Sequence, residues 1–215
     1  MSREVMVPCI NPSKHHVREH VPGSAAHREC VNMKPSAADD IPASARAKIE
    51  NREPVLMSLS DGRNVTVTPG VIDEDAQLLF TRGQCLAFAT ELSKKLGTNR
   101  VVAFSDERDN TLIHAYAEGN DGTLYDIEGD HSPEEEYERW AHYSAGIPLN
   151  EEIDDEEYVP LDEETIFVDP EVSYPVDPYE NPDDEVMQFM MSSNYLPQQV
   201  FGLAQPFAES MSNVM

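Results

Sequence analysis

Apolar and polar positions are patterned most clearly between residues 55 and 130. β-forming residues occupy Val55 to Leu59 and Val65 to Val67, and Asp61-Gly62 between them supplies the positive φ angles of a tight turn. This pattern predicts a β-hairpin. The segment from Asp73 to Phe80 has acidic residues in its first turn, where they suit the helix dipole, and it predicts a short helix.

The next segment predicts an amphipathic helix followed by three strands. Arg100 to Phe104 and Thr111 to Glu118 have the pattern of strands, and a turn at Asp121-Gly122 leads into a third strand, Thr123 to Ile127. Before them, Gly97 is a natural helix stop. The helix that it ends has apolar residues at the spacing of one face: Cys85, Phe88, Ala89, Leu92 and Leu96.

A further helix is expected directly after these strands. Ser132 would be its N-cap, Pro133 its first residue, and Glu135, three residues after the cap, would complete a capping box. We expect this helix to turn Tyr137 and Trp140 toward the core. Helices mixed with antiparallel strands in this way predict an α+β fold.

Both ends of the chain lack this periodicity, and they differ in charge. Residues 1–50 carry 7 basic and 6 acidic side chains and predict a flexible segment, apart from a short helix near Ser44 to Asn51. Residues 131–215 carry one base, Arg139, against 21 acids. We therefore expect a folded domain at 51–148 and an acidic, Pro-rich extended tail at 149–215. Its last stretch, Val186 to Met215, would form an amphipathic helix.

Three side chains in the patterned region have the chemistry of a nucleophilic site. Cys85 begins the predicted helix, and a helix N-terminus together with an imidazole activates a thiol. His114 lies in the second predicted strand and Asp126 in the third, so the tight turn between these strands brings the two side chains near each other. A carboxylate on the far nitrogen of an imidazole fixes its tautomer. The arrangement predicts a Cys–His–Asp triad.

The residues around these positions resemble the transglutaminase-like branch of the papain-like cysteine enzymes. The family's Gly-Gln-Cys-x-x-Phe-Ala core is matched at 83–89, its Leu-Gly and Arg-Val-Val passage at 96–102, and its His-x-aromatic-x-Glu strand at 114–118. The similarity covers roughly Thr81 to Asp130. It implies a small papain-like (transglutaminase-like) domain in which the cysteine helix packs on an antiparallel sheet. It also implies that the cysteine is the nucleophile, the histidine the acid/base and the aspartate its orienter.

The donors that would stabilise an oxyanion are less clearly marked. No tryptophan precedes Cys85 as in the family, so the candidates are the backbone N–H of Cys85 and, as a weaker one, the Gln84 side chain. Tyr116 is expected to support the imidazole. His131 is a rival imidazole, which we expect at the surface because it adjoins Asp130 at a helix start.

Cysteine and histidine residues also gather near the N-terminus. Sulfur and imidazole are the ligands that zinc prefers, and a closed zinc site can fold a segment that has no core. The spacing matches no standard CxxC finger, and the alternative is a weakly buffering tail. The candidate set lies within 22 residues and consists of Cys9, His20, His27 and Cys30, with His15 or His16 as alternatives to His20.

The sequence is consistent with two functions from different classes. The first is cysteine-dependent acyl transfer at an amide of a protein or peptide, by a peptidase, a deamidase or a transglutaminase-like enzyme, with no cofactor needed for catalysis. The second is a non-catalytic acidic binding or assembly protein, virus-encoded or otherwise accessory, whose tail docks on a basic partner.

Composition and charge argue against nucleic-acid-binding and membrane-spanning proteins. A net charge of −26 repels phosphate backbones and argues against direct nucleic-acid binding. No apolar run approaches the ~20 residues of a spanning helix, and the first residues lack a signal pattern. We therefore expect a soluble cytoplasmic protein without membrane contact.

Overall fold

The computed structural model describes residues 7–11, 16–20, 43–59, 62–154, 158–174, 183–192 and 200–213. The chain divides into two compact units: the first unit is Met1–Asp40 and the second unit is Ile41–Met215.

The described part of the first unit is one pair of strands. β1 (Val7–Asn11) runs antiparallel to β2 (His16–His20), with Cys9 opposite Arg18 in the register. The sequence predicted a flexible segment here, and its apolar pattern gave no sign of this pairing.

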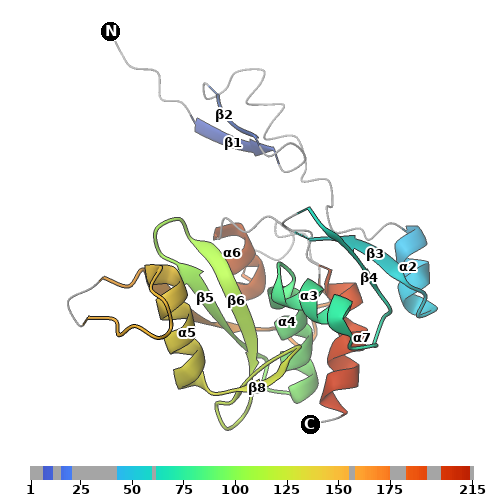
Figure 1. The fold of residues 1–215 in the computed structure, drawn as a ribbon. Helices are drawn as coiled ribbons and strands as arrows, with labels where there is room; N and C mark the ends of the chain where they lie inside the picture. Colours follow the sequence, from blue (N-terminus) through green and yellow to red (C-terminus); the bar gives the residue numbers. More distant parts are fainter. Residues whose placement is uncertain are drawn as a thin grey trace. The chain divides into compact units, whose positions relative to one another are not determined.

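The second unit is an α+β structure of helices and antiparallel sheets (Figure 1). β3 and β4 form a hairpin, and five strands form the larger sheet in the order β8-β7-β6-β5-β9. The elements are α2 (Ala43–Glu50), β3 (Val55–Ser58), β4 (Asn64–Val67), α3 (Glu74–Thr81), α4 (Cys85–Leu96), β5 (Arg100–Asp106), β6 (Thr111–Glu118), β7 (Leu124–Asp126), β8 (Gly129–His131), α5 (Pro133–Ala145), β9 (Leu161–Phe167), α6 (Glu185–Ser192) and α7 (Phe201–Ser212).

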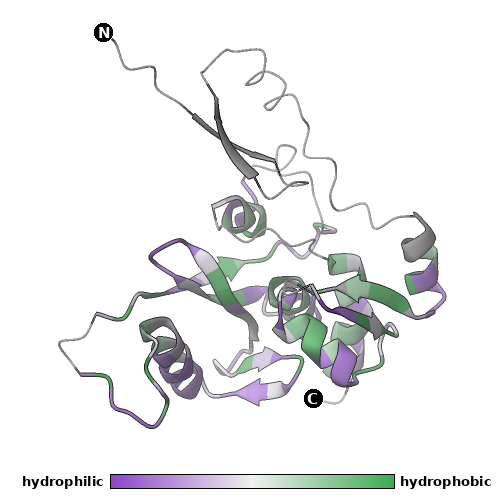
Figure 2. Ribbon diagram, turned by 45° about the horizontal axis from the view of Figure 1, so that its top comes forward, coloured by the Kyte–Doolittle hydropathy of each residue, from purple (hydrophilic) through white to green (hydrophobic). Residues whose placement is uncertain are grey.

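Alternate residues of β5 contribute to two different cores. Val101 and Ala103 belong to the larger core, together with buried side chains of α3, α4 and α7. Val102 and Phe104 belong to a smaller core with Ala141 of α5. The sheet therefore lies between α4 and α5 (Figure 1). Much of α5 has the hydrophilic colour in Figure 2, as expected for a helix with one face in solvent.

Several local predictions are confirmed. Helix α4 spans the predicted residues and ends at Gly97, whose φ of 71° is the left-handed conformation that glycine adopts most readily. Strand β6 also has the predicted bounds, and the hairpin of β3 and β4 forms. Helix α3 is capped by Asp73, whose side chain accepts a hydrogen bond from the Ala76 N–H.

Helix α5 begins at Pro133 as predicted, but two details of that prediction are wrong. The Ser132 side chain makes no capping hydrogen bond. Tyr137 is 46% exposed instead of facing the core, whereas Glu136 is buried. The buried face of this helix is set by Glu136 and the half-buried Trp140, four residues apart and therefore on one side of a helix.

The predicted extended tail contains a strand of the main sheet. β9 pairs antiparallel with β5, from Arg100 opposite Phe167 to Asp106 opposite Leu161. Only the ends of β9 bury apolar side chains, Leu161 and Ile166, and the acids between them are exposed. This composition suits an edge strand, because charged side chains discourage further pairing. The same acids led to the prediction of a solvated segment.

The last predicted helix is two helices, α6 and α7, and both contribute buried side chains to the larger core. Helix α7 packs against α4, and Phe207 lies against Phe80 with ring centroids 5.1 Å apart. The Ser210 hydroxyl donates to the Gly70 carbonyl at 2.7 Å. The second unit thus extends from Ile41 to the C-terminus, and the boundary predicted at residue 148 falls inside it. No helix in the described ranges is long and apolar enough to cross a membrane.

Phe207→Ala is expected to lower the free energy of unfolding by about 3–5 kcal/mol, because it removes one ring of the fully buried Phe80–Phe207 pair and leaves a cavity beside Phe80. The matched control is Phe167→Ala, since that side chain is 57% exposed. The control should change stability by no more than ~0.5 kcal/mol. Urea unfolding followed by circular dichroism measures both. Equal effects of the two variants would contradict the placement of α7 in the core.

Candidate active site

The imidazole of His114 is buried and hydrogen-bonded to a carboxylate. Its Nε2 lies 3.0 Å from Oδ2 of Asp126, and both side chains are almost completely buried. His114 pairs with Phe104 across the sheet, but the next pair is Leu112 with Ser105, so Ile113 is an extra residue on β6. A bulge of this kind changes the direction of nearby side chains and is common beside active sites. The predicted pairing of His114 with Asp126 is thus formed.

Cys85 is the first residue of α4 and is a free, buried thiol. Its side chain lies near His114 and is one of the groups that raise the pKa of that imidazole. Because Nε2 of this imidazole faces Asp126, Nδ1 is the nitrogen left for the thiol. Gly83, with a φ of 115°, turns the chain just before the helix. The thiol therefore lies at a helix N-terminus, where unpaired N–H groups favour negative charge.

Gln84, the residue before the thiol, is tied to the C-terminal part of the chain. Its Oε1 accepts a buried hydrogen bond of 3.1 Å from the backbone N–H of Val200, directly before α7. The carbonyl end of this side chain is thus engaged, and its NH₂ is the end left to donate to a ligand.

The carboxylate of Asp126 has three hydrogen-bond partners. Besides His114, it meets Nε2 of His131 at 2.9 Å and the backbone N–H of Glu128 at 2.7 Å, both through Oδ1. Glu128 lies in the tight connection from β7 to β8, where Asp126 pairs with Gly129, and His131 is the last residue of β8. The prediction that His131 lies at the surface is therefore wrong: its side chain is 16% exposed and contacts the site.

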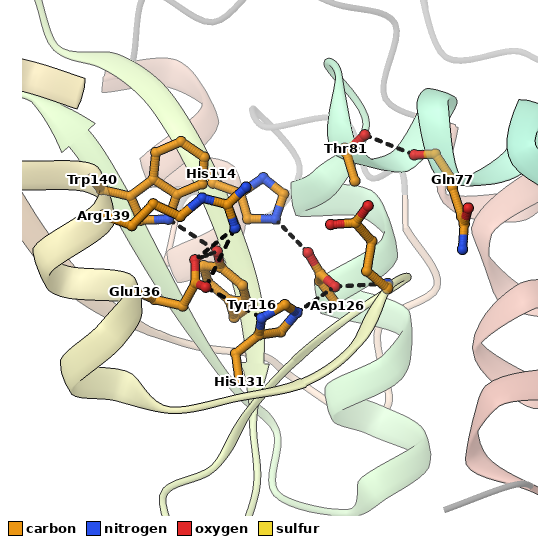
Figure 3. Close-up of polar contacts among 10 residues, drawn as sticks. Gln77, Thr81, His114, Tyr116, Asp126, His131, Glu136, Arg139 and Trp140 are labelled. Atoms are coloured by element: carbon orange, nitrogen blue, oxygen red, sulfur yellow. Dashed lines mark hydrogen bonds and ion pairs between the residues drawn. The ribbon is translucent and has the colours of Figure 1, made fainter. Parts of the chain in front are cut away.

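A chain of polar contacts continues from His131 to α5 (Figure 3). Nδ1 of His131 lies 3.2 Å from Oε1 of Glu136, and the Tyr116 hydroxyl donates to Oε2 of the same carboxylate. Trp140 in turn donates its Nε1–H to the Tyr116 oxygen at 2.9 Å.

The predicted support of His114 by Tyr116 has a geometric basis. The rings of His114 and Tyr116 pack edge to face with centroids 4.6 Å apart. The Trp140 ring stacks on His114 with centroids 5.4 Å apart. Arg139 lies over Trp140, 5.0 Å from the ring centroid. The imidazole is therefore packed between aromatic rings, which restricts its rotation.

These contacts set the charge state of the site. Burial opposes protonation of His114, but its hydrogen bonds with Asp126 and Cys85 outweigh this effect and raise its pKa to about 9. Burial likewise opposes ionisation of Asp126, yet its bonds to His114 and His131 lower its pKa below the ordinary value. Hydrogen bonds to Asp126 and Glu136 raise the pKa of His131 to about 10. Glu136 is also buried, but its bonds, led by that to His131, lower its pKa to about 2. Near pH 7 two imidazolium ions thus face two carboxylates.

The predicted zinc site lies in the first unit. Cys9 falls on β1 and His20 on β2, while His27 and Cys30 lie outside the described residues. Within the described ranges no group of three or more His, Cys, Asp or Glu residues could hold a metal ion. Structural zinc in the first unit stays a prediction.

Sequence reasoning missed the outer half of this network. Glu136 is the last of three consecutive glutamates, a run that is usually solvated, and it gave no sign of being buried. A usable signal was the spacing of Glu136 and Trp140, which places an acid and an indole on one helix face.

No family model, no curated protein and no solved structure matches the chain. The chemistry of the site therefore has to be derived from its own geometry.

The free energy of unfolding is expected to fall as the pH rises from about 7 to 10. Above the ordinary histidine pKa of 6.5, the unfolded chain loses protons that the folded chain keeps until about pH 9 for His114 and about pH 10 for His131. The contribution of these two histidines to the free energy of unfolding is therefore complete below pH 6.5 and is lost as the pH rises toward 10. Asp126 and Glu136 have lowered pKa values, so their contribution is full above about 4.5 and lost on acidification.

Urea unfolding at several pH values measures this dependence. His131→Gln removes one of the two imidazoles, so the alkaline decline should become shallower in that variant. A stability that stays constant between about pH 7 and 10 in the unaltered protein would contradict the charge states derived above.

Proposed function

We propose that the protein catalyses cysteine-dependent acyl transfer at an amide, with Cys85 as nucleophile, His114 as acid/base and Asp126 as the group that orients the imidazole. The observation that carries this proposal is a buried imidazole that is hydrogen-bonded to a carboxylate and lies near a thiol at a helix N-terminus. The order of helix, strand and strand also supports a papain-like, transglutaminase-like arrangement of the second unit.

The first half of the reaction forms an acyl-enzyme. Sγ of Cys85 attacks the amide carbonyl carbon, and a C–S bond forms as the C–N bond breaks. The proton on Nδ1 of His114 passes to the leaving nitrogen, which departs as a neutral amine. Asp126 stays ionised and holds Nε2 of the ring, so that Nδ1 keeps facing the thiol.

The second half returns the enzyme to its starting state. The neutral His114 takes a proton from water, the water oxygen forms a C–O bond with the acyl carbon, and the C–S bond breaks. Cys85 leaves as a thiolate beside the protonated imidazole. An amide and water have then become a carboxylic acid and an amine, or ammonia where the amide is a glutamine side chain.

The negative oxygen formed in each half needs hydrogen-bond donors. The backbone N–H of Cys85, at the start of α4, is one candidate, and the NH₂ of Gln84 is the other. We favour water over an amine as acceptor, because the 28 residues between Cys85 and His114 leave little room for an amine-binding loop.

The test combines thiol labelling with product release. In the full chain, iodoacetamide at pH 7 should alkylate Cys85 faster than it does in urea, with the labelled residue located by mass spectrometry. His114→Ala should slow this labelling by roughly 10-fold or more. His142→Gln, which changes a buried histidine outside the network, is the control and should leave it unchanged.

Product release is followed with a mixture of synthetic glutamine-containing peptides. Ammonia or new peptide amino termini should appear with the unaltered protein and disappear in Cys85→Ala. Release that is equal in Cys85→Ala, or labelling no faster than in the unfolded chain, would refute the enzymatic proposal.

Docking on a basic protein is the second candidate, and the exposed acids of β9 favour it. Asp162, Glu163 and Glu164 are consecutive and exposed on an edge strand. Deleting the tail would remove β9 and α7 from the fold, so charge-neutralising substitutions are the better test. D162N/E163Q/E164Q should weaken binding to polylysine several-fold at low salt and leave Cys85 labelling unchanged. Equal binding by this variant would exclude β9 as the docking surface.

A further inference from the structure

Asp126 lies between two imidazoles, and each occupies a different carboxylate oxygen. Oδ2 faces Nε2 of His114 at 3.0 Å, and Oδ1 faces Nε2 of His131 at 2.9 Å. A Cys–His–Asp mechanism uses only the first of these contacts. The second imidazole therefore has no role in the function proposed above, although it is as close to the carboxylate as the first.

Two carboxylates near His131 favour a positive charge on its ring. Both of its ring nitrogens face carboxylate oxygens, Nε2 that of Asp126 and Nδ1 that of Glu136. A neutral imidazole has one N–H, so one of these contacts would then join two acceptors. Both contacts are satisfied only when both nitrogens carry hydrogen. A hydrogen bond on one nitrogen and a carboxylate at 3.2 Å from the other thus favour an imidazolium here.

The groups around His131 come from four elements and balance its charge. Asp126 lies on β7, Glu136 on α5, and the Tyr116 ring of β6 meets the imidazole with centroids 5.5 Å apart. Arg139, one helical turn from Glu136, is the nearby cation and contacts the same carboxylate at 3.4 Å. Asp130 precedes His131 on β8 and is exposed.

This arrangement leaves the carboxylate of Asp126 one orientation. Oδ1 is held by His131 and by the Glu128 N–H, so rotation of the group would break two hydrogen bonds at once. Oδ2 is thereby directed at His114. A buried carboxylate with only one partner would be free to turn toward water or toward another donor.

We propose that His131 is a positioning residue, which holds the Asp126 carboxylate in the orientation that aligns His114 with Cys85. The proposal rests on the function proposed above, because alignment of His114 serves the thiol. His131 touches neither the thiol nor the reacting amide and acts only through Asp126.

The titration of the His114 imidazole tests the proposal without reference to any substrate. It is followed by NMR of the full chain with ¹⁵N-labelled histidine, in which His114 should titrate near pH 9. His131→Gln keeps an N–H donor within reach of Asp126 but removes the positive charge. His131→Ala removes both, and His131→Phe keeps an aromatic ring against Tyr116 without a donor, for use if the alanine variant does not fold.

The variants separate positioning from charge. If His131 positions Asp126, the pKa of His114 should fall by about one unit or more in His131→Ala and His131→Phe, because the carboxylate turns away. In His131→Gln it should stay or rise, because the carboxylate is still held and a nearby cation is gone. Asp130→Asn is the matched control, because Asp130 lies on the same strand as His131 but is exposed. In this variant His114 should titrate as in the unaltered protein. Equal His114 titration in all variants, or a rise in His131→Ala, would overturn the proposal.

Labelling of Cys85 by iodoacetamide in the same variants separates this inference from the proposed function. Its rate should fall several-fold in His131→Ala and His131→Phe and be retained in His131→Gln. A Cys85 that is unreactive in the unaltered protein, together with the expected His114 shifts, would refute the enzyme but not the positioning of Asp126. If Cys85 is reactive but its labelling rate is the same in all three His131 variants as in the unaltered protein, the positioning role alone is refuted.

Discussion

The buried carboxylate of Asp126 is the group on which the geometry of the site depends. An ionised carboxylate withdrawn from water costs several kcal/mol unless its oxygens are paired. The pairing is provided by β6 through His114, by β8 through His131 and by the backbone of the β7–β8 connection at Glu128. Three separate parts of the backbone thus converge on one side chain. The short strand β8, which carries no apolar side chain, contributes a partner of this carboxylate.

The network also separates the site from the charge of the rest of the chain. The protein carries a net charge of −26, and an isolated imidazolium–carboxylate pair at its surface would feel that field. Here two cations, His114 and His131, alternate with two anions, Asp126 and Glu136, over contacts of 2.9 to 3.2 Å. Such an alternating set is close to neutral as a whole. The chemistry at Cys85 is therefore governed by its immediate neighbours and less by the acidic surface.

Local sequence patterns predicted the inner part of this unit and failed where contacts join distant segments. Helix α4, strand β6 and the Asp126 position follow from helical spacing, alternation and turn residues, all of which act within a few residues. Strand β9 pairs with β5 some 60 residues away, and its exposed acids conceal the pairing. The burial of Glu136 likewise depends on partners from β6 and β8. The pairing of β9 has no local signal, and for Glu136 the spacing to Trp140 marks the helix face but not the distant partners that bury it.

The nucleophile depends on the end of the chain in the same way. Helix α4 is buried along nine consecutive residues from Cys85 to Ser93, and α7 covers it together with the main sheet and α3. The Val200 N–H then fixes the Gln84 side chain beside the thiol. The end of the segment that was predicted as an acidic, extended tail therefore packs against the helix that carries the cysteine. The site thus combines residues 84 and 85, 114, 126 and 200, so its geometry depends on contacts between segments that are far apart in the sequence.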